Sequence, residues 1–268
     1  SYNNYNDIFS ALTISKSLPT NSGTVIVKHA NPCGVSIHKD NLKSYKLALA
    51  CDPISAFGGI VACNFKMGKI LATELNNIFL EVVIANGFDN AAIKILKKKK
   101  NLRLIDATNF KIKDLVRFNS ANEVILTQSE DIRKFNIKDF KIVSKKKPTK
   151  SQLKNLIFAF NVCRYVKSNA VVLASHETTV GIGSGQPSRL DSCQIAIDKM
   201  NKFENFNDEI VAASDAFFPF VDGIEKLVQA GVSAVIQPFG SIRDNEIIKF
   251  ANQTNTVLVF SRTRHFRH

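Results

Sequence analysis

The residues best suited to chemistry in the first part of the sequence are Lys28 and His29, which follow the β-branched run 25–27. Histidine has an ordinary pKa near neutrality, so His29 can act as a general base. Lys28 can bind an anion or stabilise a developing negative charge. Pro32 and Gly34 predict that the strand ends and turns beside them, and only such a bend lets two consecutive strand residues serve one site. The alternative is an exposed polar strand end without a chemical role.

A second group of candidates lies around the glycine-rich stretch VGIGSGQPSR at 180–189. Its glycines lack the spacing of a dinucleotide-binding fingerprint, so we expect no NAD. Glycines of this kind let a backbone approach a ligand closely, and Arg189 would then reach an anionic group. The alternative is a simple turn between a strand and a helix.

Aromatic residues and carboxylates alternate in the stretch ASDAFFPFVDG at 213–223. Phe217 and Phe220 lie between Asp215 and Asp222, in a loop where their rings can stack on a planar heterocycle. A hydrophobic plug beneath the loop is the alternative. The final stretch, SRTRHFRH, places arginines and histidines around Phe266. Chain ends usually fray, but this aromatic residue and the strand before it favour burial against a site.

The elements that carry these candidates alternate between strands and helices. Apolar β-branched runs are followed by amphipathic helical patterns, which predicts an α/β fold. The polar residues come just after the strands, and open α/β sheets bind ligands at the carboxyl ends of their strands. The polar segment SKKKPTKSQ at 144–152 contains a helix-breaking proline and is the candidate domain boundary. Strands are predicted near 24–28, 59–63, 80–85, 170–176, 233–241 and 256–261.

The composition is typical of a soluble globular protein, with 45% hydrophobic and 22% charged residues in a chain of 268. The apolar runs are far shorter than the roughly 20 residues of a membrane span, so we expect no membrane partner. No basic-then-apolar leader is present, so we expect no secretion signal. The five cysteines contain no CxxC pair, which disfavours a disulfide scaffold or a zinc site and suits buried thiols in a reducing cytoplasm.

The net charge of +13 raises the possibility of a nucleic-acid partner. Much of the charge lies in two lysine clusters, at 96–101 and 144–150. Neither cluster is interleaved with aromatic residues, and no nucleic-acid-binding motif accompanies them. We therefore predict a solvated lysine surface and no nucleic-acid partner, with a basic RNA-binding protein as the alternative. A positive field would also favour an anionic small substrate.

Taken together, these stretches resemble one family, from the first residue to the last. They occur in the order and approximate spacing of the transformylase portion of the bacterial-type AICAR transformylase/IMP cyclohydrolases, the bifunctional proteins of purine biosynthesis. Eight ordered motifs carry the resemblance: SYNN, VIVKHANPCGV, DPISAFGGIVA, KSNAVVLA, VGIGSGQPSR, ASDAFFPFVDGIEK, AVIQPFGSIRD and TRHFRH.

The resemblance implies a fold and an assembly. It implies two cytidine-deaminase-like α/β/α lobes without zinc, the first at 1–145 and the second at 146–268, in a homodimer whose active sites lie at the subunit interface. It implies formyl transfer from 10-formyltetrahydrofolate to the 5-amino group of AICAR, giving formyl-AICAR, in the cytoplasm. The family also has an N-terminal cyclohydrolase domain and an Arg-Tyr-Gly motif upstream of SYNN. Neither is in this sequence, so we expect a fragment of a longer enzyme.

The resemblance also implies roles for individual residues. Lys28, His29 and Asn169 match the catalytic positions: His29 is the base, Lys28 stabilises developing charge, and Asn169 holds the formyl oxygen. Asp215 and Ser168 are candidate ligands of a potassium ion. The residues implied to contact the nucleotide or folate are Arg189, Phe217, Phe220, Asp222, Arg264 and Phe266.

Three positions depart from the family pattern. Val221 stands where an arginine is expected, Phe239 where a glycine is expected, and Pro187 where a methionine is expected. These departures affect the expected folate contacts and loop shapes more than the chemistry, because the three catalytic matches are all present. A second alternative is a catalytically silent module that serves only dimerisation.

Overall fold

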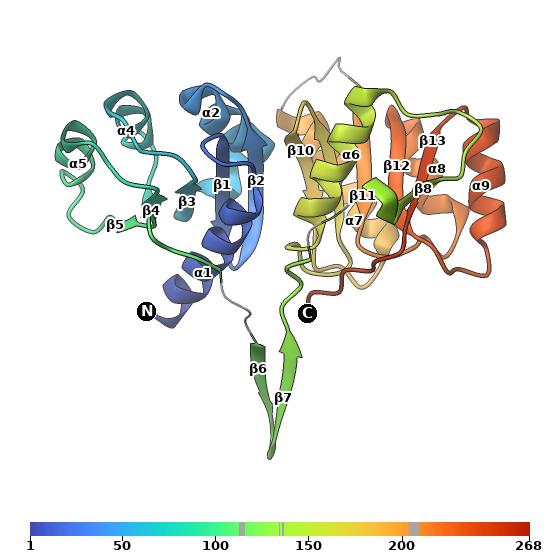
Figure 1. Cartoon of the computed structure of the whole chain (residues 1–268), viewed down its shortest axis with the longest axis horizontal. Coiled ribbons are helices and arrows are strands. Elements are labelled where there is room, and N and C mark those ends of the chain that lie inside the picture. The colour runs from blue at the N-terminus through green and yellow to red at the C-terminus, as the bar shows by residue number, and fades with distance from the viewer. Residues whose placement is uncertain (113–115, 134, 136, 204–208) are drawn as a thin grey trace.

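The computed structural model describes residues 1–112, 116–133, 135, 137–203 and 209–268. The predicted α/β fold is confirmed: the described strands form a mixed sheet of 11 strands and a separate two-stranded sheet, with helices packed on the larger one (Figure 1). The strands predicted near 24–28, 59–63 and 80–85 are present as Gly23–Lys28, Gly59–Cys63 and Leu80–Ala85. No helix in the described part of the chain combines the length and hydropathy needed to cross a bilayer.

The first lobe begins with a helix that precedes a hairpin, and helices and strands then alternate. Asp40, Asp52 and Asp89 begin three of its helices by accepting hydrogen bonds from the backbone N–H groups of Lys43, Ser55 and Ala92, as helix-capping aspartates do. Its elements are α1 (Tyr2–Ser17), β1 (Gly23–Lys28), β2 (Asn31–Ile37), α2 (Asn41–Cys51), α3 (Pro53–Ala56), β3 (Gly59–Cys63), α4 (Lys69–Leu75), β4 (Leu80–Ala85), α5 (Asn90–Leu96) and β5 (Arg103–Asp106).

A connecting region leads to the second lobe, where Thr149 and Gln152 form a reciprocal capping box at the start of α6. The connection contains β6 (Val116–Ala121), β7 (Val124–Ser129), the 3₁₀ helix η1 (Ile137–Asp139) and β8 (Phe140–Ile142). The second lobe contains α6 (Lys150–Cys163), β9 (Val171–Ser175), β10 (Thr178–Gly183), α7 (Arg189–Phe203), β11 (Ile210–Ser214), α8 (Val221–Gln229), β12 (Val232–Pro238), α9 (Asp244–Gln253) and β13 (Val257–Ser261).

The two lobes repeat one topology, although the sequence shows no clean repeat. The sheet order β2-β1-β3-β4-β5 in the first lobe matches β10-β9-β11-β12-β13 in the second. In each lobe the first two pairings are antiparallel and the last two are parallel. The lobes join where β2 lies antiparallel to β10, with a hydrogen bond of 2.8 Å between the hydroxyls of Ser36 and Thr178.

The predicted boundary near residue 145 lies between β8 and α6, far in the chain from the strands β2 and β10 that join the two halves of the sheet. β8 ends before that position and pairs with β13, so it extends the half of the sheet formed by the second lobe. The division of the chain into two independent domains stays a prediction.

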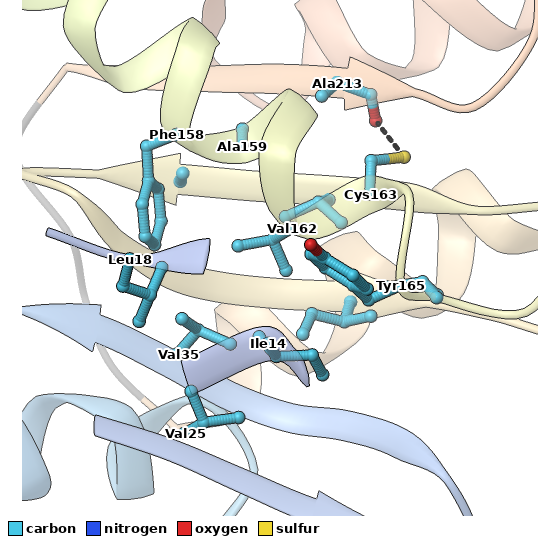
Figure 2. Packing of buried hydrophobic residues seen from close by; sticks show 14 of the residues in the cluster. Ile14, Leu18, Val25, Val35, Phe158, Ala159, Val162, Cys163, Tyr165 and Ala213 are labelled. Atoms are coloured by element: carbon cyan, nitrogen blue, oxygen red, sulfur yellow. Dashed lines mark hydrogen bonds between the residues drawn. The ribbon is translucent and has the colours of Figure 1, made fainter. Parts of the chain in front are cut away.

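Alternate residues of the strands enter different hydrophobic cores. Val25 and Val27 face a core that both lobes share with α1 and α6, whereas Ile26 faces a core with α2, α4 and α5. A third core lies under α7, α8 and α9. Figure 2 shows the shared core, with Ile14 and Leu18 on the α1 side and residues of α6 gathered over the same strands.

Glycines in the hairpins allow helices to pack closely on the sheet. A Cβ on Gly34 in β2 would lie 1.8 Å from the carbonyl oxygen of Ala48 in α2, and one on Gly183 in β10 would lie 1.9 Å from that of Ser192 in α7. Gly181 meets α7 in the same way, at 2.1 Å from the oxygen of Ala196. Gly34, Gly181 and Gly183 thus serve helix packing. For two of the three glycines of 180–189, the close backbone approach expected from the sequence is an approach to α7.

The five cysteines are buried and free, as the sequence predicted. Burial raises the pKa of the thiols of Cys33, Cys51, Cys63 and Cys193 to about 12. Thiols with such a pKa are protonated near neutrality and therefore poor nucleophiles.

Candidate active site

The turn between β1 and β2 places His29 at a hairpin tip. His29 and Ala30 adopt positive φ angles of 52° and 59°, and the chain reverses there rather than at Pro32 and Gly34, which lie within β2. The predicted position of the bend was therefore wrong by two residues. Asp7 of α1 stabilises the turn because its carboxylate accepts hydrogen bonds from the backbone N–H groups of His29 and Ala30, at 3.1 and 2.7 Å. The His29 side chain is exposed.

Lys28 points to a different neighbour from His29. Its ammonium group donates a hydrogen bond of 2.5 Å to the carbonyl oxygen of Phe57, in the loop between α3 and β3. The ring of Phe57 lies 5.4 Å from that of Phe79, and both residues are exposed. An ammonium group has three N–H donors, so Lys28 keeps two for a ligand that enters beside this loop.

The second lobe contributes a buried ion pair. Asp215 follows β11 and is fully buried, and Arg189, the first residue of α7, donates to its Oδ1 atom at 2.7 Å. The hydroxyl of Ser168 donates to the other carboxylate oxygen at 2.6 Å. Arg189 also donates to the carbonyl oxygen of Phe217, at 3.3 Å. The sequence placed these four residues in three separate motifs, and the fold brings them together.

Asn169 is held by contacts on both ends of its amide. Its oxygen accepts a hydrogen bond from Arg189 at 2.7 Å, and its nitrogen donates to the carbonyl oxygens of Gln186 and Pro187, at 2.9 and 2.8 Å. An amide nitrogen has two donors, so both are in use within the protein. Pro187, one of the departures from the family pattern, acts here through its backbone.

The final residues of the sequence pack against this cluster. The backbone N–H of His265 donates to the carbonyl oxygen of Asp215 at 2.9 Å, and the backbone N–H of Ser168 donates to the carbonyl oxygen of Arg267 at 2.9 Å. The guanidinium carbon of Arg264 lies 5.8 Å from the ring centre of Phe217. The ring of Phe266 is half exposed and stacks on His268. The tail is therefore anchored, with Arg264 at the surface.

Two contacts join the hairpin tip of the first lobe to the cluster of the second. The side chain of Asn31 accepts a hydrogen bond from the backbone N–H of Lys167 at 2.9 Å. Arg267 donates to the hydroxyl of Ser10 at 3.3 Å, and this hydroxyl donates to the carbonyl oxygen of Ala30 at 2.9 Å. We define the candidate site as this junction: the turn 28–31, the loop 167–169, Arg189, Asp215 and the tail 264–268.

Two implied ligand-contacting residues lie apart from the buried cluster. Phe220 is 51% exposed, and the guanidinium of Arg243 lies 4.8 Å above its ring. Asp222 is exposed near the start of α8 and accepts a hydrogen bond from the backbone N–H of Gly223. Phe239 is half exposed, and Val221 begins α8. These side chains are free to meet a ligand, but no contact in the described residues joins them to Asp215.

The implied potassium ligands do not form an open cation site. Asp215 and Ser168 are hydrogen-bonded to each other, and the Arg189 guanidinium compensates the carboxylate charge. A potassium ion on these oxygens would lie beside a cation, so the described geometry does not fit it. The described residues also contain no group of three or more His, Cys, Asp or Glu side chains placed to hold a metal ion. Potassium stays a prediction of the resemblance.

Sequence reasoning missed the residues that position the site. Asp7 lies 22 residues from His29 in the chain, so no local pattern marked it. The buried side chain of His265 bonds through Nδ1 to the carboxylate of Asp131, which also lies 3.8 Å from Arg164. Burial alone would raise the pKa of Asp131, but the hydrogen bond with His265 and the charges of His265 and Arg164 outweigh it and hold this pKa below its ordinary value.

Comparison with known proteins identifies similar chains. Residues 1–199 match the family model described as AICARFT/IMPCHase bienzyme. Relatives named bifunctional purine biosynthesis protein PurH include those of Persephonella marina, 44% identical over 273 residues, Leptospira biflexa, 42% over 269, and Buchnera aphidicola, 45% over 274. Each comparison covers 100% of this chain and 51 or 52% of the relative. The chain thus spans about half the length of the curated relatives it matches.

Proposed function

The chain belongs to the AICARFT/IMPCHase bienzyme family, and from this premise we propose that it carries the transformylase reaction. The substrates are AICAR and 10-formyltetrahydrofolate, and the products are formyl-AICAR and tetrahydrofolate. We propose further that the parent protein of this chain, like the bifunctional relatives of about twice this length, is also an IMP cyclohydrolase. We place the reaction in the cytoplasm, because buried free thiols suit a reducing compartment.

The chemistry transfers a formyl group between two nitrogen atoms. The 5-amino nitrogen of AICAR attacks the formyl carbon, a new C–N bond forms, and the bond from that carbon to the folate nitrogen breaks. One proton leaves the amine and one reaches the departing folate nitrogen. The amine is a weak nucleophile because its lone pair is delocalised into the imidazole and carboxamide. A base is therefore valuable, and we assign this role to His29.

Lys28 and Asn169 would stabilise the negative charge that develops on the formyl oxygen. Lys28 has two N–H donors left after its bond to Phe57. Asn169 has none left, because both go to carbonyl oxygens of the 186–187 loop. The proposed role of Asn169 therefore requires that one of these bonds opens when substrate binds. A donor that is already in position, such as a free N–H of Lys28, typically contributes about 10²–10³-fold to kcat.

The nucleotide and folate would lie around the second-lobe cluster and the tail. Arg264 has no hydrogen-bond partner among the described residues, so its guanidinium is free to bind an anionic ligand. Arg189 holds Asp215 and Asn169 and would contact the nucleotide only from its remaining donors. The exposed rings of Phe220 and Phe266, together with Asp222, would complete the binding surface.

One observation carries this proposal: the Lys28–His29 turn is tied to the loop that holds Asn169. The bond from Lys167 to Asn31 and the path from Arg267 through Ser10 to Ala30 make the tie. Residues 136 and 257 positions apart in the chain meet there. An isolated Lys-His pair at a strand end has no such partner.

We also propose that the chain acts as a homodimer. The β6–β7 hairpin projects away from the main sheet in Figure 1, and every residue of β7 is exposed. An isolated two-stranded hairpin is marginal in water, so this arm needs a partner. Its large apolar side chains, between 51% and 72% exposed, are Val116, Phe118, Val124, Ile125 and Leu126.

The test is formyl transfer by this chain and by its His29→Ala variant, with tetrahydrofolate formation as the readout. We expect turnover by the parent chain and a fall of kcat by about 10²–10⁴ in the variant, with AICAR binding retained. His38→Ala is the matched control, because His38 lies on the surface at the other end of β2. A His29→Ala chain with kcat within about threefold of the parent would remove His29 from the mechanism.

A further inference from the structure

A large cavity lies outside the candidate site, between α1 and α6. Its volume is about 680 Å³, within the range that takes drug-sized ligands. Its walls come from the end of α1, the end of β2, the length of α6, the segment 110–112, and residues 132, 133 and 135. None of its lining residues belongs to the candidate site. Three of its lining residues, Leu18, Phe158 and Tyr165, are labelled in Figure 2, where they pack over the strands of the shared core.

The lining of this groove is largely apolar and rich in aromatic rings. Such surfaces bind flat organic molecules, because the rings supply contact area with little loss of conformational freedom. Ile157 on α6 is one of the lining residues, and its side chain is partly exposed. The apolar side chains that line the groove include Ile37, Phe110, Ile132, Phe135, Ile157 and Tyr165.

The charged residues of the groove leave a positive excess. Five cations line it against one carboxylate, that of Glu177. Lys154 pairs with Glu177, Arg133 with Asp139 and Arg164 with Asp131. Two cations, Lys16 and Lys111, are left without a carboxylate partner among the described residues.

Lys16 and Arg164 are built into the wall of the groove. The ammonium of Lys16 donates to the side chain of Asn86 and the carbonyl oxygen of Ala107, at 2.9 and 3.0 Å, which leaves one donor. Burial lowers its pKa from the ordinary lysine value. Arg164 has a side chain only 4% exposed, and its Nε–H has no hydrogen-bond partner in the described structure. Its guanidinium lies 4.2 Å from the ring centre of Phe135.

We propose that this groove binds a small aromatic acid, with its ring system on the apolar wall and its acidic group beside Lys16 and Lys111. The apolar surface alone would take a neutral molecule equally well, and it is the two uncompensated cations that select an anion. An anion there would also compensate the penalty that Lys16 pays for partial burial. The proposal is independent of the proposed formyl transfer, since no residue is shared.

The test uses a fluorescent aromatic sulfonate, 8-anilinonaphthalene-1-sulfonate, with the 268-residue chain. We expect saturable binding of one molecule per chain, and binding about tenfold weaker for the neutral analogue N-phenyl-1-naphthylamine. Ile157→Glu should weaken sulfonate binding by about tenfold or more, because it places a carboxylate on the apolar wall. Ile242→Glu is the control, since Ile242 is fully exposed elsewhere.

A second pair of variants tests the proposal even if Ile157→Glu does not fold. Lys111→Glu reverses an exposed charge at the groove and should weaken sulfonate binding by about tenfold, whereas Lys100→Glu on another surface should not. Equal affinity for the charged and neutral probes would overturn the proposal, as would equal effects of the groove and control variants. If the sulfonate does not bind and Ile157→Glu instead converts a dimer into monomers, the groove is an interface between copies and the proposal fails.

Discussion

At the scale of single residues, His29 depends on a carboxylate from another element. A non-glycine residue at positive φ costs about 1 kcal/mol or more, and the hairpin tip has two of them in succession. Asp7 offsets this cost by accepting both N–H groups of the tip. The second lobe repeats the arrangement at His176 and Glu177, where Asn155 of α6 accepts the N–H of Glu177. The position of His29, the proposed base, is thus set from α1, outside the motif that contains it.

Asp7→Ala should therefore destabilise the chain and misplace His29. We expect a loss of about 1–3 kcal/mol in the free energy of unfolding, because the partly buried N–H of Ala30 and the exposed N–H of His29 both lose their acceptor. Formyl transfer should fall while AICAR binding persists. Asp7→Asn keeps one acceptor oxygen and should give an intermediate result. Urea unfolding and turnover of the three chains measure this, and an Asp7→Ala chain as stable as the parent would contradict it.

Asp215 joins three parts of the candidate site: Arg189, Ser168 and the tail at His265. Its carboxylate is fully buried and accepts from Arg189 and Ser168. Asp215→Ala would leave the Arg189 guanidinium, 11% exposed, without its counter-charge. Removing one partner of a buried pair typically costs about 3–5 kcal/mol, so we expect a large drop in unfolding free energy by urea titration. Asp222→Ala, at an exposed carboxylate in the first turn of α8, should change it by less than about 0.5 kcal/mol.

At the scale of elements, the close contact between the hairpins and their helices depends on glycine. Gly183→Ala would drive a methyl group into the backbone of α7, and a backbone carbonyl cannot move aside as a side chain can. We expect a loss of more than about 3 kcal/mol, at or above the upper end of overpacking effects. Gly68→Ala is the control, because the nearest atom to its added Cβ is a side-chain oxygen at 3.6 Å. Similar melting temperatures for the two variants would refute the packing argument.

The tail is a second element whose role depends on tertiary contacts. Deleting residues 263–268 would remove the N–H donated to Asp215, the carbonyl that accepts from Ser168, and the free guanidinium of Arg264. We expect AICAR binding to weaken by roughly 10- to 150-fold, which corresponds to the loss of one charge-assisted hydrogen bond. Calorimetric titration of the deleted chain with AICAR measures this, and an unchanged affinity would remove the tail from the site.

At the scale of the whole molecule, an ion pair on the α7 side of the sheet ties the lobes together. Lys199 of α7 lies 2.6 Å from the carboxylate of Asp52, which begins α3 in the first lobe. Burial alone would raise the pKa of Asp52, but hydrogen bonds from Lys199 and Ser55 outweigh it and lower this pKa. A lowered folded-state pKa contributes stability above the unfolded-state pKa, and this contribution is lost as the pH falls through the folded value.

Lys199→Met should consequently destabilise the chain at pH 7 and have a smaller effect in acid. We expect a loss of about 1–3 kcal/mol at pH 7, because a buried carboxylate loses a charged donor. The difference from the parent should shrink as Asp52 becomes protonated below its ordinary pKa. Lys249→Met, at an exposed position of α9, is the control. Urea midpoints measured across this pH range test the sign, and a loss independent of pH would contradict it.

Assembly is the other property of the whole molecule, and it depends on the β6–β7 arm. Exchanging Phe118 and Ile125 for serine should convert the proposed dimer into monomers, because each buried side chain of this size contributes about 1.5–3 kcal/mol. Ile242→Ser controls for the loss of an exposed apolar residue. Sedimentation at micromolar concentration distinguishes the outcomes. A double variant that stays dimeric would exclude the arm from the interface.

The sequence alone determined the α/β class, the strands that end in polar motifs, and the family. These are local properties: β-branched runs, helical periodicity and motif spacing lie within a few dozen residues of one another. Lys28, His29 and Asn169 could be named because each lies in a short recognisable stretch. Only the tertiary structure decided that the lobes repeat one topology, that the tip of the hairpin lies at His29, and that Gly183 serves α7. It also decided that the amide donors of Asn169 are already in use and that Asp7 holds the turn at His29 and Ala30. Each of these depends on contacts between residues far apart in the chain, and no local pattern encodes which distant groups will meet when the strands pair and the helices pack.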